Sequence, residues 1–183
     1  MVTTKKSAKK TGRKTSASKK KKTSSTGSVK RKKTFRTIDQ ALRYLFDRTD
    51  YERQQKLRYN VTTFDLTRMQ ALLKSLANPH KKLKTVHIAG TKGKGSTAAM
   101  LAKMVEANGY KVGVYSSPHV LTINERITIN GKLISNSEMT NLISRCHASI
   151  EKLAKKKDNA PTFFEIMTAM AFMHFVDNDV DLR

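Results

Sequence analysis

The chain has 183 residues, enough for one ordinary domain with or without a tail, and carries a net charge of +23. Residues 1–36 hold 15 of the 37 Lys and Arg residues and no Asp or Glu, so residues 37–183 carry only +8. No stretch is long and apolar enough to span a bilayer. The single cysteine, Cys146, excludes an internal disulfide and is typical of a reducing compartment, so we expect a cytoplasmic protein with Cys146 buried rather than reactive.

The N-terminal segment repeats Lys, Ser and Thr, and Val29 is the only bulky apolar residue in residues 5–34. Such a segment buries too little apolar surface to offset the entropy of ordering, so we expect residues 1–34 to form a disordered basic tail. It lacks the apolar core of a signal peptide and the amphipathic rhythm of a transit peptide. Nonspecific contact with nucleic acid through counterion release and a purely solubilising role both remain open for the tail.

Two amphipathic helices are predicted next, each with a capping-box pattern at its start. In "TIDQALRYLFD" (37–47), Thr37 is followed three residues later by Gln40. In "TRMQALLKSLANP" (67–79), Thr67 is followed by Gln70, and the Asn-Pro pair at the end stops the helix. The polar segment 48–64 between them is typical of a loop.

A strand–helix–strand unit follows. "TVHIA" (85–89) and "KVGVYS" (111–116) are rich in β-branched residues, and "STAAMLAKMVEANG" (96–109) between them has the composition of a helix ending at Asn-Gly. Because two strands joined by a helix run parallel in one sheet, this pattern predicts an α/β fold. We expect His87, on the first strand, to be packed in the core.

The C-terminal part of the chain predicts a hairpin and two helices. In "ITINGKLI" (127–134), Asn130-Gly131 between alternating apolar residues indicates a tight hairpin. Ser135 and Glu138 form a capping box for the first helix. "TFFEIMTAMAFMHFV" (162–176) is apolar on almost every side and so predicts a buried helix. Its methionines are expected to fill the core: Met167, Met170 and Met173.

Three glycines and two lysines follow the first predicted strand, in "GTKGKGS" (90–96). Glycines let backbone N–H groups approach a polyphosphate, and the following helix adds its positive N-terminal end. Lys94 can supply a compact charge, and Ser96 or Thr97 a hydroxyl for phosphate or magnesium. The spacing differs from the common G-x-x-x-x-G-K-[ST] loop because Gly95 separates Lys94 from Ser96. The stretch predicts a phosphate-binding loop.

This loop resembles the ATP loop of the Mur-type amide ligases, and more narrowly that of the folylpolyglutamate synthase/dihydrofolate synthase family. The narrower resemblance rests on "GYKVGVYSSPHVLTINERITINGKLIS" (109–135) and "PTFFEIMTAMAFMHF" (161–175), and it covers roughly residues 37–183. It implies that residues 35–183 are the N-terminal part of a P-loop, Mur ligase-type central ATP-binding domain, an α/β domain with a parallel sheet.

The resemblance also implies roles for individual residues. Lys94 would be the catalytic residue, Ser117 would bind magnesium, and Asn124 and Glu125 would belong to a loop beside the folate. Segment 61–64 is a further candidate for substrate contact. The residues implied to bind ATP are Thr91, Lys92, Gly93, Lys94, Gly95 and Ser96. Those implied to bind the pterin or folate are Arg126, Thr162, Phe163, Phe164 and Glu165, although Thr162 and Glu165 also form a capping box in their own right.

The activity implied by the resemblance is ATP- and Mg²⁺-dependent joining of L-glutamate to dihydropteroate or a reduced folate, by a protein that is a monomer at full length. In that family a glycine-rich strand with a metal-binding glutamate, a metal-binding histidine and a C-terminal domain follow. The chain stops before them, so we expect an inactive fragment. Two alternatives stay open: a Mur-type peptidoglycan amide ligase, and a P-loop protein that binds nucleic acid through its basic tail.

Overall fold

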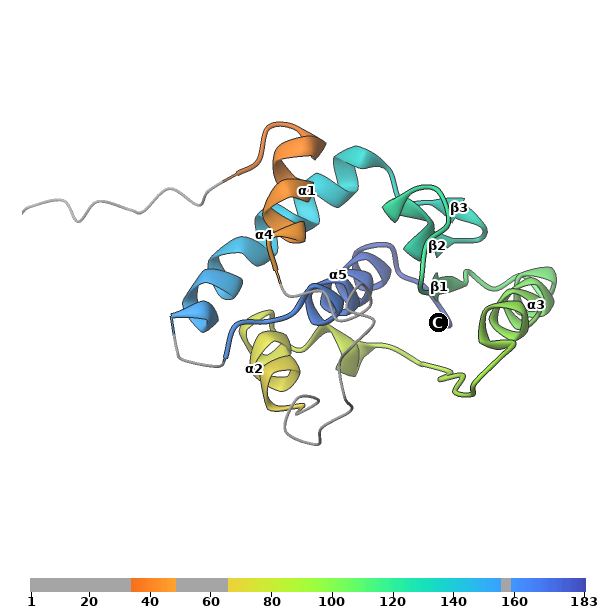
Figure 1. The fold of residues 1–183 in the computed structure, drawn as a ribbon. Coiled ribbons are helices and arrows are strands. Elements are labelled where there is room, and N and C mark those ends of the chain that lie inside the picture. Colours follow the sequence, from red (N-terminus) through yellow and green to blue (C-terminus); the bar gives the residue numbers. More distant parts are fainter. Residues whose placement is uncertain (1–33, 49–65, 156–158) are drawn as a thin grey trace, which may run out of the picture. The chain divides into compact units, whose positions relative to one another are not determined.

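The structure of the protein is a computed structural model that describes residues 34–48, 66–155 and 159–183 (Figure 1). The predictions of a disordered tail and of substrate contact by residues 61–64 lie outside the described residues, as does most of the predicted loop 48–64. Within residues 34–183 the described segments belong to one compact unit.

A central helix organises the fold. Helix α5 (Phe163–Asp177) is contacted by α2 (Thr67–Ser75), by the short 3₁₀ helix η1 (Pro79–Lys82) and by α4 (Asn136–Ala154), while α1 (Ile38–Phe46) packs against α4 (Figure 1). Because α5 is apolar on nearly every side, it is stable only when other elements cover it all round. The sequence prediction of a buried helix is confirmed.

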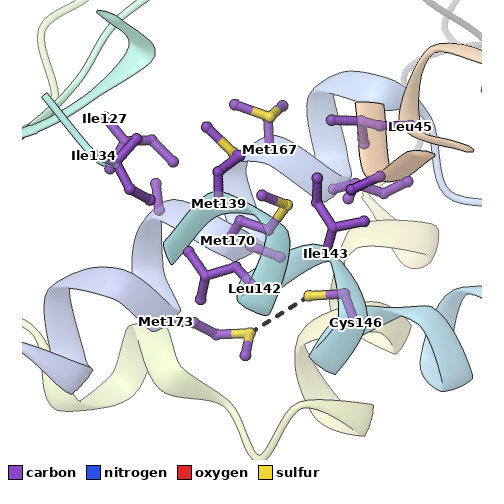
Figure 2. Packing of buried hydrophobic residues seen from close by; sticks show 14 of the residues in the cluster. Leu45, Ile127, Ile134, Met139, Leu142, Ile143, Cys146, Met167, Met170 and Met173 are labelled. Carbon is purple, nitrogen blue, oxygen red and sulfur yellow. Dashed lines mark hydrogen bonds between the residues drawn. The ribbon is translucent and has the colours of Figure 1, made fainter. Parts of the chain in front are cut away.

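Sulfur-containing side chains fill much of the space between α4 and α5 (Figure 2). Met139, Met167 and Met170 are fully buried, as the periodicity predicts for the α5 methionines. The buried Cys146 thiol donates a hydrogen bond to the Met173 sulfur at 3.6 Å. Burial raises the pKa of Cys146 to about 12, so the expectation of a structural rather than reactive cysteine is confirmed.

The predicted caps at three of the helix starts are present. Ser135 and Glu138 form a reciprocal capping box on α4, Thr162 and Glu165 form one on α5, and the Thr37 hydroxyl caps α1. The prediction for α2 is wrong by one residue. There the Gln70 N–H donates to the Leu66 carbonyl at 2.9 Å, so Leu66 is the N-cap residue and Thr67 is already helical.

The sheet has an antiparallel part, β1 (Gly113–Tyr115), β2 (Ile127–Ile129) and β3 (Lys132–Leu133), in that order. Asn130 (φ 47°) and Gly131 (φ 71°) connect β2 and β3, both in the left-handed region that a tight two-residue turn needs. The predicted hairpin is confirmed.

The other edge of β1 pairs in parallel. Val112 forms a parallel bridge with Leu182, the Val86 N–H donates to the Arg183 carbonyl at 2.6 Å, and the Arg183 N–H donates to Lys84 at 3.2 Å. Segment 181–183 therefore lies between segment 84–86 and β1, the parallel arrangement predicted for this part of the chain.

The predicted strand 85–89 is not a regular strand in the structure: Val86 makes one ladder hydrogen bond, and the backbone of residues 87–89 makes none within the described residues. His87 is exposed, and its expected place in the core is wrong. Helix α3 (Lys94–Ala107) follows and has no buried residue. None of the helices in the described ranges has the length and apolar character needed to cross a membrane.

Candidate active site

The loop before α3 has the backbone geometry expected of a phosphate loop. Gly93 is the N-cap residue of α3 and has φ 77°, a left-handed conformation that glycine adopts without strain. The Lys94 ammonium folds back and donates to the carbonyls of Gly90, at 2.7 Å, and Thr91, at 3.4 Å. The positive charge is thus held over the loop by exposed contacts that an incoming anion can replace.

The hydroxyls of Ser96 and Thr97, both candidates for ligand contact, differ in their hydrogen bonding. The Thr97 hydroxyl donates to the Gly93 carbonyl at 3.0 Å and stabilises the first turn of α3. The Ser96 hydroxyl makes no hydrogen bond to the described part of the chain, and the residue is exposed. Ser96 is therefore the hydroxyl available to a ligand.

A cavity of about 310 Å³ lies between the start of α3 and the end of β1. Lys94 and Gly95 contribute from the first turn of α3, Ser116 and Ser117 from the turn after β1, and Phe164 from the start of α5. The remaining walls are mainly apolar, from segment 86–88, the α3 face and β1: Val86, Ile88, Ala98, Leu101, Ala102, Val105, Val112 and Val114. The Lys94 ammonium group, the Ser117 hydroxyl and the Phe164 ring thus share one cavity.

Ser117 has the chemistry of a magnesium ligand. It is exposed, it precedes a cis peptide bond to Pro118, and its hydroxyl makes no hydrogen bond within the described ranges. No cluster of three or more His, Cys, Asp or Glu side chains is present among the described residues. Mg²⁺ commonly takes one or two protein oxygens together with substrate phosphates and waters. A hydroxyl that shares a cavity with a phosphate loop fits that ion.

The segment after Ser117 is fastened by Asn124 and Glu125. The Glu125 carboxylate, in the 3₁₀ helix η2 (Ile123–Arg126), accepts from the N–H groups of three consecutive residues, 120–122, at 2.7–2.9 Å. These hydrogen bonds, first among them that from Val120, lower the pKa of Glu125. The Asn124 amide donates to the Ile134 carbonyl at 2.6 Å, which ties η2 to the end of the hairpin.

Arg126 points away from this exposed loop surface into the protein. Its side chain is only 2% exposed, its Nε–H donates to His119 Nδ1 at 2.9 Å, and its guanidinium lies 5.1 Å from the centre of the Phe163 ring. Arg126 does not line the cavity that contains Ser117.

The start of α5 divides its side chains between core and cavity. Phe163 is 1% exposed, whereas Phe164 is 42% exposed, lines the cavity and lies 6.0 Å from the Tyr115 ring. Thr162 and Glu165 are engaged in the capping box, and Glu165 also accepts a hydrogen bond from Arg68 at 3.3 Å. Phe164 is the residue of this segment that faces a ligand-sized space.

Comparison with known proteins decides the family. No protein-family model matches the chain. It is 45% identical over 112 residues to the dihydrofolate synthase/folylpolyglutamate synthase of Bacillus subtilis, covering 61% of this chain and 26% of that protein. It is 36% identical over 121 residues to the folylpolyglutamate synthase of Lacticaseibacillus casei, covering 66% of this chain and 28% of that protein.

Solved structures agree in fold. The folylpolyglutamate synthase of Thermotoga maritima matches with a TM-score of 0.69 at 36% identity, over 79% of this chain and 31% of that one. A folylpolyglutamate synthase in complex with AMPPCP and folate matches with a TM-score of 0.69 at 32% identity, over 80% of this chain and 34% of that one. The chain belongs to the folylpolyglutamate synthase/dihydrofolate synthase family. It spans about a quarter to a third of the length of these relatives.

In this synthase-family chain the cavity brings together four of the residues predicted from sequence: Lys94, Gly95, Ser117 and Phe164. The remaining predicted residues do not line it: Thr91, Lys92, Gly93, Ser96, Arg126, Thr162, Phe163 and Glu165. The first four of these are exposed, in or next to the loop before α3.

Sequence reasoning missed two residues that shape the site. Tyr115 lines the cavity beside Phe164. Alternate residues of a strand lie on the same face, so the position of Tyr115 two residues after Gly113, which also lines the cavity, was the signal available in the sequence. His119 accepts the hydrogen bond from Arg126, and nothing in the local pattern distinguishes it from an ordinary turn residue.

Proposed function

We propose that the full-length protein joins L-glutamate to dihydropteroate, to a reduced folate or to both, with hydrolysis of ATP to ADP and phosphate. The observation that carries the proposal is the shared cavity of Lys94, Gly95, Ser117 and Phe164, which gathers a phosphate-loop cation, a hydroxyl ligand and an aromatic contact. The 45% identity to a dihydrofolate synthase/folylpolyglutamate synthase supports the choice of reaction.

The reaction has two steps. An acceptor carboxylate oxygen attacks the γ-phosphorus of ATP, and ADP leaves, which gives an acyl phosphate. The glutamate nitrogen then attacks the acyl carbon, phosphate leaves, and the nitrogen loses a proton to form the amide. The first step builds negative charge on the transferring phosphoryl group, so it needs fixed positive charge and N–H donors at that place.

In the first step Lys94 and the start of α3 supply those groups. The Lys94 ammonium gives up its contacts to the Gly90 and Thr91 carbonyls and turns to the outer phosphates. The backbone N–H groups after Gly93 and the positive end of α3 stabilise the rest of the polyphosphate. The free Ser96 hydroxyl adds one more hydrogen bond.

Ser117 would hold magnesium, which supplies charge neutralisation at the β- and γ-phosphates when bound. Phe164 and Tyr115 present ring faces and edges to the cavity, the type of surface on which a flat pterin or aminobenzoyl group packs. Exclusion of water from that apolar side also protects an acyl phosphate from hydrolysis.

The test is a ligation assay with the full-length protein, ATP, Mg²⁺, glutamate and a panel of acceptors. We expect phosphate release and a glutamylated product with dihydropteroate or a reduced folate. Lys94→Ala should lower turnover roughly a hundredfold, comparable with the loss of other preorganised donors. The matched control is Lys103→Ala, on the same helix, where the exposed lysine only pairs with Glu106 at 2.7 Å.

If none of the pterin or folate acceptors gives phosphate release, or if the Lys94→Ala enzyme stays within threefold of wild type, the proposal is refuted. Product formation only with a muramyl-peptide acceptor would assign the chain to peptidoglycan ligation instead. The 183-residue chain by itself spans about a quarter of its curated relatives, and we expect it to bind nucleotide weakly and to form no product.

The cellular setting follows from the same proposal. Glutamate, ATP and a free buried thiol at Cys146 all fit a reducing cytoplasm, and the full-length protein would act as a monomer. The basic segment 1–34 would add at most nonspecific contacts to nucleic acid, outside the ligation reaction.

A further inference from the structure

Ser117 lies in a turn that one residue holds from both sides. On the N-terminal side, the Ser116 N–H donates to the Arg126 carbonyl at 3.0 Å. On the C-terminal side, the Arg126 Nε–H donates to His119 Nδ1 at 2.9 Å. The backbone and the side chain of Arg126 therefore bracket the Ser117-Pro118 pair, and both contacts are short enough to restrict where the Ser117 hydroxyl stands.

Arg126 is itself anchored in the helical core. The guanidinium lies 5.1 Å from the centre of the Phe163 ring, and Phe163 is fully buried at the first position of α5. Cation–π contacts of this kind gain strength when water is excluded. The placement of the Ser117 turn thus depends on α5, which is distant in sequence but joined to it through one arginine.

A second device holds the rest of the turn. The Glu125 carboxylate collects the N–H groups of residues 120–122, so the exposed part of the loop is fixed independently of Arg126. Loss of the Arg126 side chain should consequently shift the Ser117 end of the turn without unfolding the whole loop.

We propose that Arg126 is a positioning residue for the Ser117 hydroxyl, acting through His119, rather than a ligand of the acceptor substrate. The inference rests on the proposed function and replaces the role in pterin or folate binding expected from sequence. A side chain that is 2% exposed and absent from the cavity wall has no surface to offer a substrate. Residues that orient a metal ligand from behind commonly change metal affinity 10- to 100-fold when removed.

The experiment measures binding of AMPPCP to the full-length protein by calorimetry, with EDTA and across a Mg²⁺ titration. Arg126→Gln should raise the Mg²⁺ concentration for half-maximal binding roughly tenfold, while affinity in EDTA stays within about threefold of wild type. Arg126→Lys should recover part of the loss, because an ammonium can donate to His119 and lie over Phe163. In steady-state assays the KM for the acceptor should stay nearly constant while kcat falls.

His119 provides a second route in case Arg126→Gln fails to fold. His119→Ala should reproduce the Mg²⁺ effect, and His119→Asn should restore function, since its Oδ1 can accept where Nδ1 did. In the background of Ser117→Ala, Arg126→Gln should cause little further loss, because groups that act through one another are not additive. Arg145→Gln is the matched control. It breaks an arginine–carboxylate pair with Asp177 between α4 and α5, outside the cavity.

Three outcomes overturn the inference. The folded Arg126→Gln and His119→Ala proteins could show the wild-type Mg²⁺ dependence, or AMPPCP binding to the wild-type protein could be independent of Mg²⁺. Third, Arg126→Gln could raise the KM for the acceptor while its Mg²⁺ dependence stays normal. The last would make Arg126 a direct acceptor ligand. The proposed function fails separately, if the wild-type protein binds AMPPCP with Mg²⁺ but ligates no glutamate. In that case the binding data still decide the role of Arg126.

Discussion

Gly113 in β1 has no space for a side chain. A Cβ built at this position would stand 2.6 Å from Cδ1 and Cε1 of Phe175 and 3.0 Å from its Cγ. Phe175 is 1% exposed within the core, and Gly113 is held by its hydrogen bond to the Leu182 carbonyl and by pairing with Ile129. Neither partner is free to yield, so we predict that Gly113→Ala destabilises the fold.

The magnitude follows from the cost of overpacking. Extra methyl groups in a well-packed core cost about 1–3 kcal/mol of unfolding free energy. For a chain of this length each kcal/mol lowers the melting temperature by about 2–4 °C, so Gly113→Ala should melt roughly 2–12 °C below wild type. Urea denaturation and thermal melting of the 183-residue chain both measure this.

Two comparisons isolate the contact. Phe175→Leu lacks the ring edge, so in that background Gly113→Ala should cost at least about 1 kcal/mol less than alone. Gly95→Ala is the same substitution at a helical site where the new Cβ meets nothing within 4 Å, and it should be neutral or slightly stabilising. An unfolding free energy of Gly113→Ala within about 0.5 kcal/mol of wild type, or strict additivity with Phe175→Leu, would refute the packing argument.

Three further predictions concern two side chains and the N-terminal segment. Cys146, fully buried and with its pKa raised to about 12, should stay unlabelled by a thiol reagent at pH 8 until urea unfolds the chain; fast labelling of the native protein would contradict the packing. The lowered pKa of Glu125 contributes stability above the ordinary carboxyl pKa of about 4.3, and this is lost as the pH falls through the folded-state pKa. Glu125→Gln should therefore lower the urea midpoint at pH 7, and this difference from wild type should shrink as the pH falls below about 4; a difference that does not change with pH would contradict it. Deletion of residues 1–34 should abolish nonspecific DNA binding and leave ligation intact, and loss of ligation would show that the tail takes part in catalysis.

Features with local causes could be predicted from the sequence. The Asn130-Gly131 turn and the capping box of Ser135 and Glu138 arise from residues within a few positions of one another, and both are present. The phosphate loop belongs to the same class, because glycine geometry and the helix start that follows it are local properties. The start of α2 is an exception among these local features. The prediction took Thr67 as the N-cap residue, but the Leu66 carbonyl accepts a helical hydrogen bond from Gln70, so the helix starts one residue earlier.

Features that depend on distant partners could not be predicted in this way. His87 was placed in the core on strand character alone, but burial there requires a neighbouring strand, and no described segment hydrogen-bonds to its backbone. Arg126 stands beside Asn124 and Glu125 in one short motif, yet its side chain turns inward. The cause is Phe163, 37 residues later, whose ring receives the guanidinium. No periodicity in residues 109–135 contains that information.

The start of α5 connects the two halves of the candidate site. Successive residues on a helix point about 100° apart, so Phe163 can enter the core below Arg126 while Phe164 faces the cavity that holds Ser117. The capping box of Thr162 and Glu165 fixes the rotation of this helix end, and with it both directions at once. The sequence "TFFE" therefore has a stronger explanation than substrate contact along its whole length. Phe163 packs under Arg126, Phe164 lines the cavity in which we propose that the acceptor binds, and Thr162 and Glu165 cap the helix end that carries both rings.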